Sequence, residues 1–246
     1  MPDGKRIFPS AVAFLKDGTT EVGVNAIRAR YIADGITVMN WKRLFGRNYD
    51  PDYLKKVELS CRAKVVQDGN RYAFHVPTRT DLVSPELVCS VLLRWICDKI
   101  VEATNCTDLN LCLTIPAAYS YHQRNAMKVV LQLAGIEYPV IFVTEPAAAS
   151  VAYTIDRVVS NGNILVYDLG GGTFDASILE VAGNTLKVKN WRGNIDIGGE
   201  LFDQRIMNYV EQQYRNELDA EILPCIDDEE HDPVFIRAKQ HLLQYC

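Results

Sequence analysis

The most informative pattern in the chain is a short apolar run that ends in an acid and three glycines. The run is Ile164-Leu165-Val166-Tyr167, and three of its four residues are β-branched or aromatic, which predicts a buried strand. After the glycines, Thr173, Asp175 and Ser177 alternate with apolar residues, the period of a half-buried strand. Gly183-Asn184 is a turn signal before a third alternating stretch. The pattern therefore predicts a three-strand meander.

Upstream, the apolar pattern switches between strand and helix periods. Ala11–Leu15 is a strand candidate. Ser84-Pro85-Glu86 predicts a helix start, because it combines a capping serine, a proline in the first turn and an acid near the positive end. Residues 109–115 alternate as a strand that ends at Pro116. Ser120 and Gln123 then have capping-box spacing for a further helix, which Gly135 stops.

The order of elements indicates the fold class. Pro139–Val143 is a further strand candidate, and an alanine-rich helix follows from Thr144 through Tyr153. After the meander, apolar residues from Leu201 onward recur with helical spacing. Strand–helix–strand–helix followed by a meander and a helix suits a mixed α/β fold with two similar halves.

Composition narrows the class of protein. The 246 residues suffice for one large or two modest domains. The net charge of −5, with no basic block, argues against a nucleic-acid partner. The start of the chain does not resemble a signal peptide, and we expect no membrane span, because no apolar run is long enough. The seven cysteines are scattered without a CxxC pair, which predicts a reducing compartment, and we expect a cytoplasmic location.

The glycine run also predicts chemistry. Glycine lets backbone N–H groups approach a ligand closely, and here Gly170, Gly171 and Gly172 lie between Asp168 on one side and Thr173 and Asp175 on the other. Amides cradle phosphate oxygens, and acids hold a hydrated Mg²⁺. The run is neither a Rossmann fingerprint nor a P-loop, because those lead from glycines into a helix. The alternative is an ordinary hairpin with a flexible tip.

The run Asp168–Asp175 resembles the second phosphate loop of the actin-like ATPases, in the form found in the seventy-kilodalton heat-shock chaperones. Four further runs are similar to that family: Thr114–Ala117, Gln123-Arg124, Glu145-Pro146 and Ile195–Asp203. The resemblance implies an α/β, actin-like ATPase (ribonuclease-H-like) two-lobe fold. Lobe I would be residues 1–157, without the opening phosphate-loop hairpin. Lobe II would be residues 158–246, its first part only. The chain would then be a fragment, or would lack half of its phosphate clamp.

The resemblance also implies roles for individual residues around ATP or ADP and Mg²⁺. Gly170–Gly172 would hold the β- and γ-phosphates, and Thr173 would position the attacking water or a γ-oxygen. Asp168 and Asp175 would act on Mg²⁺ through water, and Glu145 would support that hydration shell. The remaining nucleotide contacts would come from the turn beneath the ribose and phosphates, at Gly198, Gly199 and Glu200.

Some positions depart from the family pattern. Trp41–Arg47 resembles the family's Lys-Arg-Leu-Ile-Gly-Arg turn, and counting back without a gap places the catalytic lysine at Ile27, next to Arg28. Arg28 also fits a solvated helix face. The surface that J-domain co-chaperones use has three substitutions, which weaken the case for such a partner: Ile141, Thr144 and Ala147. Pro116 and Arg124 match the proline and the arginine that, in this family, relay between the nucleotide and the substrate domain. Alternatively, Pro116 only ends a strand and Arg124 only lies on a helix surface.

Two functions therefore stay open, with a third less favoured. The first is the ATP-binding domain of a chaperone that couples nucleotide state to binding of unfolded polypeptides through a domain outside this sequence, with weak or no hydrolysis here. The second is a degenerate, non-hydrolysing relative that acts as a binding or scaffold protein. The chaperone-like runs argue against a sugar kinase or a filament-forming actin relative. Residues 217–232 are acidic and predict a solvated loop, and residues 240–246 predict the start of another helix.

Overall fold

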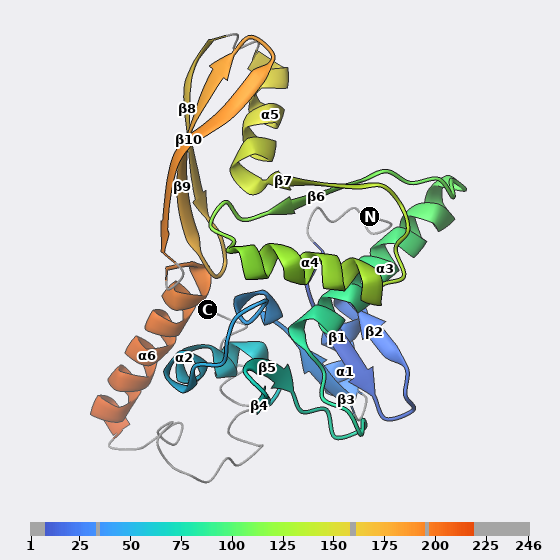
Figure 1. Ribbon diagram of the computed structural model, residues 1–246. Coiled ribbons are helices and arrows are strands. Elements are labelled where there is room, and N and C mark those ends of the chain that lie inside the picture. Colours follow the sequence, from blue (N-terminus) through green and yellow to red (C-terminus); the bar gives the residue numbers. More distant parts are fainter. Residues whose placement is uncertain (1–7, 33–34, 158–160, 195–196, 219–246) are drawn as a thin grey trace. The chain divides into compact units, whose positions relative to one another are not determined.

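The structure is a computed structural model that describes residues 8–32, 35–157, 161–194 and 197–218. The chain divides into two compact units, Met1–Glu145 and Pro146–Cys246, and Figure 1 labels their elements. The predicted boundary between lobes, at residues 157 and 158, differs from this division and stays a prediction.

The first unit begins with a small antiparallel sheet. Strand β1 (Val12–Leu15) lies between β2 (Thr20–Val22) and β3 (Gly35–Val38). The turn between β1 and β2 is closed by Asp17, whose carboxylate accepts the Thr19 N–H at 2.9 Å and its hydroxyl at 2.6 Å. These bonds lower the pKa of Asp17. Helix α1 (Val24–Ile32) packs on this sheet through small residues, among them Ala11, Ala13 and Ala26.

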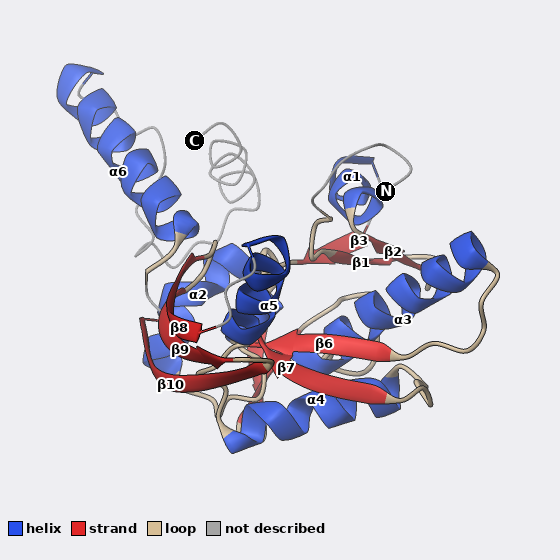
Figure 2. Ribbon diagram, turned by 90° about the horizontal axis from the view of Figure 1, so that it is seen from above, coloured by secondary structure: helices blue, strands red, loops and turns tan. Residues whose placement is uncertain are grey.

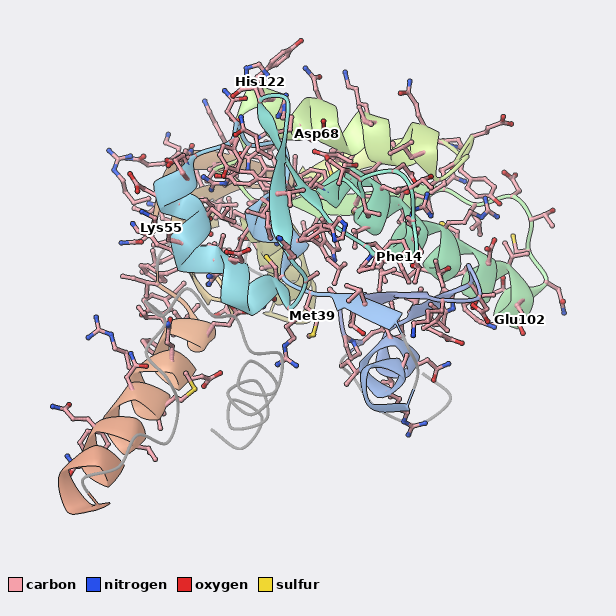
Figure 3. The ribbon with its side chains drawn as sticks, turned by 90° about the horizontal axis from the view of Figure 1, so that it is seen from below. Phe14, Met39, Lys55, Asp68, Glu102 and His122 are labelled. Atoms are coloured by element: carbon pink, nitrogen blue, oxygen red, sulfur yellow. The ribbon has the colours of Figure 1, made fainter. Side chains whose placement is uncertain are left out.

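The long helix α3 (Pro85–Thr104) borders the main core of this unit. Ser84 begins the helix as predicted, because its hydroxyl accepts the Leu87 N–H at 3.1 Å. Side chains from strands, loops and helices meet in this core, and its largest buried members include Tyr72, Phe45, Phe74 and Leu44. Phe14 lies inside the unit, whereas Glu102 lies at its periphery (Figure 3).

A strand–helix–strand segment completes the first unit. Strands β6 (Leu111–Ile115) and β7 (Val140–Thr144) pair in parallel, and α4 (Tyr121–Leu133) connects them beside α3 (Figure 2). The predicted capping box is confirmed: the Ser120 hydroxyl accepts the Gln123 N–H at 3.3 Å, and the Gln123 side chain accepts the Ser120 N–H at 3.0 Å. Gly135, with φ of 60°, follows the helix end.

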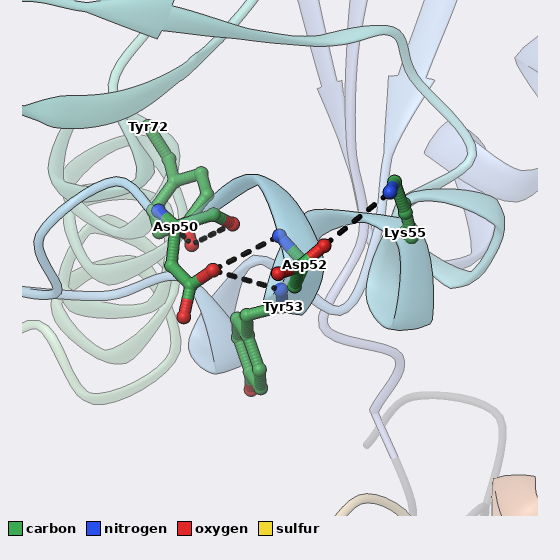
Figure 4. A network of polar contacts seen from close by, with 5 residues as sticks. All are labelled: Asp50, Asp52, Tyr53, Lys55 and Tyr72. Carbon is green, nitrogen blue, oxygen red and sulfur yellow. Dashed lines mark hydrogen bonds and ion pairs between the residues drawn. The ribbon is translucent and has the colours of Figure 1, made fainter.

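Further elements of this unit, like β2 and β3, were not predicted from the sequence. They are the 3₁₀ helix η1 (Trp41–Arg43), helix α2 (Pro51–Cys61) and the hairpin β4 (Val65–Asp68) and β5 (Arg71–Phe74). Asp50 caps α2 by accepting the N–H groups of Asp52 and Tyr53, and Tyr72 of β5 exchanges two hydrogen bonds with the Asp50 backbone (Figure 4). Burial raises the pKa of Tyr72. The hairpin is thus tied to the start of α2.

The second unit holds the predicted meander. Strands β8 (Asn161–Leu169), β9 (Phe174–Ala182) and β10 (Thr185–Asn194) are antiparallel with β9 central. Helix α5 (Glu145–Arg157) precedes them and α6 (Gly199–Leu218) follows. The predicted order of elements is confirmed. Glu217 belongs to the end of α6, whereas residues 219–232 and 240–246 lie outside the described residues.

One face of this sheet is buried along β9 and the other is open, so the prediction that residues 164–167 form a buried strand is wrong: β8 is largely exposed. Ser177, Leu179 and Val181 of β9 are buried. Apolar side chains on the opposite face of the described sheet stay exposed, with Tyr167 at 68% and Leu165 at 66%. The apolar face predicted for α6 is also largely exposed, apart from Met207.

Candidate phosphate-binding site

A two-glycine turn joins β8 to β9. The Gly170 N–H donates to the Thr173 carbonyl at 2.9 Å, which leaves Gly171 and Gly172 at the tip. A Cβ built on Gly171 would meet nothing within 4 Å, and one on Gly170 would meet only the Thr173 carbonyl, at 3.3 Å. At Gly171 the turn is therefore not packed against other side chains.

The two acids that flank the turn lie on one face of the sheet. Asp168 and Asp175 are direct partners in the β8–β9 ladder. Side chains of such partners leave the same face with Cβ atoms about 4.5–5.5 Å apart, and like charges placed so are destabilising. Asp168 is exposed and Asp175 half-buried. A cation near both carboxylates would remove this repulsion.

A second glycine turn packs directly on the first. A Cβ on Gly198 would lie 2.5 Å from the Gly171 carbonyl oxygen and 2.7 Å from the Gly172 carbonyl carbon. The first amides of α6 bond to the same turn: Gly199 N–H donates to the Gly170 carbonyl at 3.0 Å, and Glu200 N–H to the Gly171 carbonyl at 2.8 Å. Only a residue without a side chain fits at position 198.

These bonds orient the peptide groups of the turn. In a planar trans peptide, the C=O and N–H groups point in opposite directions. Because the Gly170 and Gly171 carbonyls point at the start of α6, the N–H groups of Gly171 and Gly172 point away from it. Gly198, Gly199 and Glu200 thus support the turn, a role that sequence analysis did not foresee. Their predicted place beneath the ribose and phosphates stays a prediction.

Within the first unit, an ion pair joins Lys42 to Glu145, and the sequence motifs did not predict it. Lys42 Nζ lies 2.9 Å from Glu145 Oε1, with side-chain exposures of 56% and 28%. Ile27, at the position counted for a lysine, is instead half-buried on α1 against the small alanine cluster. Lys42 opens the matched turn at residues 42–47, and this motif was the signal that could have identified it.

Backbone contacts on both sides fix the turn that carries Lys42. The Gly46 N–H donates to Glu86 Oε1 of α3 at 3.1 Å, and Gln123 Nε2 of α4 donates to the Phe45 carbonyl at 3.3 Å. A Cβ on Gly46 would lie 2.8 Å from the Gln123 Cα, and Gly46 has φ of 63°. Position 46 therefore requires glycine for two reasons: the close contact with Gln123 and the left-handed backbone conformation.

The residues expected to relay nucleotide state are joined through one tyrosine. Arg124 Nε donates to the Tyr119 carbonyl at 3.1 Å, and the Tyr119 N–H donates to the Pro116 carbonyl at 3.2 Å. The Tyr119 ring stacks on Phe45 with centroids 6.1 Å apart. Burial raises the pKa of Tyr119, and the charge of Glu145 raises it further. Whether Pro116 and Arg124 act as a relay stays a prediction.

The donor set fits magnesium. No cluster of three or more histidine, cysteine or acidic side chains that could hold a metal occurs within the described ranges. Mg²⁺, however, keeps several waters and is commonly bound by one or two carboxylates together with substrate phosphates. Asp168 and Asp175 supply two carboxylates beside an open glycine turn, which matches that mode.

The mixed α/β architecture, with a glycine-rich β-hairpin turn supported by a helix start, is compatible with the actin-like ATPase fold. A comparison with known protein families agrees with this fold: the model of the Hsp70 family (Hsp70 protein) matches residues 2–225 of the chain. The chain belongs to the Hsp70 family. Membership implies a chaperone ATPase-type function, and the family generally binds ATP or ADP with Mg²⁺. Among the residues that the structure describes, no helix is long and apolar enough to cross a membrane.

Proposed function

We propose that this chain binds Mg·ATP through the turn at Gly170–Gly172, as the nucleotide-binding part of a chaperone whose nucleotide state governs binding of unfolded polypeptides. The peptide partner would engage a domain outside this sequence. Family membership supports the nucleotide, and the geometry of the second unit supports the assignment to this turn.

The observation that carries the proposal is the orientation of the turn. Two carbonyls are held by α6 amides, so the Gly171 and Gly172 N–H groups point the other way. Nothing within 4 Å would meet a side chain at Gly171. Successive backbone N–H groups in a concave turn are a recognised anion site. The β- and γ-phosphates are the ligand that this arrangement fits.

Asp168 and Asp175 would hold Mg²⁺ through its bound waters. A bound Mg²⁺ neutralises charge on the phosphates. The two carboxylates would orient its waters, and Thr173, at the end of the turn, would position the attacking water or a γ-oxygen. Phosphoryl transfer depends mainly on positioning and charge neutralisation, so these few groups suffice for the part of the reaction assigned to them.

Lys42 is the lysine that we assign to this chemistry, in place of the position of Ile27. Its ammonium is held 2.9 Å from Glu145 Oε1, the residue expected to support the magnesium hydration shell. A lysine is a compact point charge that suits a phosphate oxygen. If Lys42 has this role, the chain does not lack the lysine that ATP hydrolysis needs. Slow hydrolysis stays a prediction.

A non-hydrolysing scaffold is the second candidate. Ile141 is 62% exposed on β7, where the family pattern has an arginine, and Thr144 and Ala147 replace the asparagine and threonine near it. An apolar residue in place of a cation alters any partner surface there. Binding of Mg·ATP without measurable turnover would favour this candidate, whereas turnover would exclude it.

Thermal unfolding in the presence of nucleotide tests the proposal. Ligand that binds only the folded state stabilises it by RT ln(1 + [L]/Kd), about 2.7 kcal/mol at a hundredfold excess over Kd. We expect millimolar Mg·ATP to raise the Tm of the wild-type chain and to have less effect on Asp168→Asn. The Tyr167→Ala variant, changed on the opposite face of the same strand, is the matched control. An unchanged wild-type Tm would contradict the proposal.

A further inference from the structure

Asp175 of β9 pairs with Asp168 on one neighbouring strand, β8, and with Gly193 on the other, β10. Across the three-strand sheet, Asp168 of β8, Asp175 of β9 and Gly193 of β10 are successive direct partners, so all three face the same side. A Cβ on Gly193 would clash with Asp175 Oδ1, and it would lie 3.0 Å from the Phe174 carbonyl oxygen and 3.2 Å from Asp175 Cγ. The Asp175 carboxylate thus extends over Gly193, into space that any other residue would fill.

An irregularity in β10 places glycine at this point. The ladder between β9 and β10 shifts register between Val188 and Asn190, which leaves Lys189 as an extra residue. Asp175 is seven residues from Ala182, the partner of Thr185. An unbroken ladder would therefore pair Asp175 with the residue seven positions after Thr185, which is Arg192. The bulge replaces an arginine by a glycine beside the carboxylate.

The difference between these two neighbours is chemical. An arginine directly across the strands would form an ion pair with Asp175, and it would compete with a metal for the same oxygens. A glycine places no side chain beside the carboxylate and gives it room to lean away from Asp168. Bulges beside active sites commonly re-aim side chains in this way.

We propose that Gly193, placed by the bulge at Lys189, is a positioning residue that holds the Asp175 carboxylate in its magnesium-binding orientation. The inference rests on the proposed function, because it concerns the same Mg·ATP site. A side chain at position 193 would push the Asp175 carboxylate off its position over β10, back toward Asp168. Magnesium-dependent nucleotide affinity should fall, whereas metal-free affinity should not.

The test compares ATP affinity with magnesium and with EDTA in wild type and Gly193→Ala, by titration calorimetry. We expect Gly193→Ala to lose about tenfold or more in affinity with magnesium, the usual cost of disturbing a group that orients a metal ligand. In EDTA the two proteins should bind alike. Gly193 is not in the left-handed region, so alanine adds no backbone strain of its own. Arg192→Ala, which faces the other side opposite Ala176, should bind as wild type in both conditions.

A double-mutant comparison separates a carboxylate effect from a general loss of structure. If Gly193→Ala acts through Asp175, it should change nothing further in an Asp175→Gly background. Should Gly193→Ala alone fail to fold, Asp175→Gly with Gly193→Ala should restore folding, because the clashing Asp175 oxygen is gone and only the 3.0 Å approach to the Phe174 carbonyl oxygen remains. An additive loss, or failure of the double variant to fold, would overturn the inference.

The two possible failures are distinguishable. A wild-type chain that binds no Mg·ATP removes the proposed function and this inference together. A wild type whose affinity rises with magnesium, beside a Gly193→Ala variant whose affinity rises equally, removes the inference alone.

Discussion

The two units differ in how completely they bury their apolar side chains. In the first, nineteen buried residues from strands, helices and loops form one cluster that includes Phe45, Phe74 and Val130. In the described part of the second, the large buried apolar side chains are Leu179, Val181 and Met207. A cavity of about 430 Å³ also lies between α5 and β8. The unit with the glycine turn is the one whose described residues form the smaller core.

This difference indicates where ligand binding should matter most for stability. Segments that bind ligands are often drawn from the less stable part of a protein, and a ligand stabilises what it binds. Few apolar side chains are buried among the described residues of the second unit, so we expect its unfolding to depend on Mg·ATP. The first unit has a large buried core, so its unfolding should depend less on Mg·ATP.

The largest expected effect is in the first core. Phe74→Ala removes a fully buried ring and should cost about 3–5 kcal/mol in free energy of unfolding. Tyr167→Ala, at 68% exposure in the second unit, should stay within about 0.5 kcal/mol. Urea denaturation followed by tryptophan fluorescence measures both, since Trp41 and Trp95 report on the first unit and Trp191 on the second. Equal losses would remove the contrast between the units.

Lys42 lies in the first unit, and its replacement tests the role that we propose for it. Lys42→Ala should lower the rate of ATP hydrolysis by about 10²–10³, the usual cost of removing one charge-stabilising group. The ion pair with Glu145 is substantially exposed, so the stability change should be at most about 1 kcal/mol. Single-turnover kinetics and urea titration give the two values. Unchanged turnover in Lys42→Ala would exclude the role assigned to Lys42.

Gly198 tests how the two glycine turns depend on each other. Gly198→Ala places a Cβ 2.5 Å from the Gly171 carbonyl oxygen, so one backbone must move. A displacement of about 1 Å can cost 10²-fold, and we expect a loss of that order in ATP affinity by calorimetry. In Gly199→Ala the nearest atom is 3.7 Å away, an ordinary contact, so its loss should be the smaller. A reversed order would contradict the support assigned to α6.

The smallest effects come from two buried hydroxyls that behave oppositely. Thr37 Oγ1 donates to the Ala26 carbonyl at 2.9 Å in the first unit, so Thr37→Val should cost about 1–3 kcal/mol. The Ser150 hydroxyl, fully buried in the second unit, has no hydrogen-bond partner among the described residues. Ser150→Ala should be neutral or stabilising by up to about 1 kcal/mol. Paired urea titrations measure the sign of the change in the free energy of unfolding. Destabilisation by Ser150→Ala would contradict the prediction that the Ser150 hydroxyl is buried at a cost.

Local signals in the sequence predicted much of this structure. The caps at Ser84 and Ser120 and the alternation in β9 depend on residues close together in the chain, so they could be read directly. Helix α2 could also have been found, because Asp50-Pro51 is a cap followed by a proline.

Other features depend on long-range contacts and could not be read in this way. The contact between Gly171 and Gly198 joins two turns that are far apart in sequence. The bulge at Lys189 reverses which residues of β10 face Asp175, and strict alternation hides it. Lys42, by contrast, could have been found, because it is part of the matched motif itself. It was missed because counting back from that motif placed the lysine at Ile27.

The most direct test of the central claim is an NMR titration of chain labelled with ¹⁵N-glycine. The fifteen glycines make a sparse spectrum, and Gly171→Ala identifies one signal by its loss. We predict that Mg·ATP shifts the amide signals of Gly171 and Gly172 most, and that the signals of Gly18 and Gly69 in the first unit stay in place. Saturating Mg·ATP that moves neither Gly171 nor Gly172 would contradict the account.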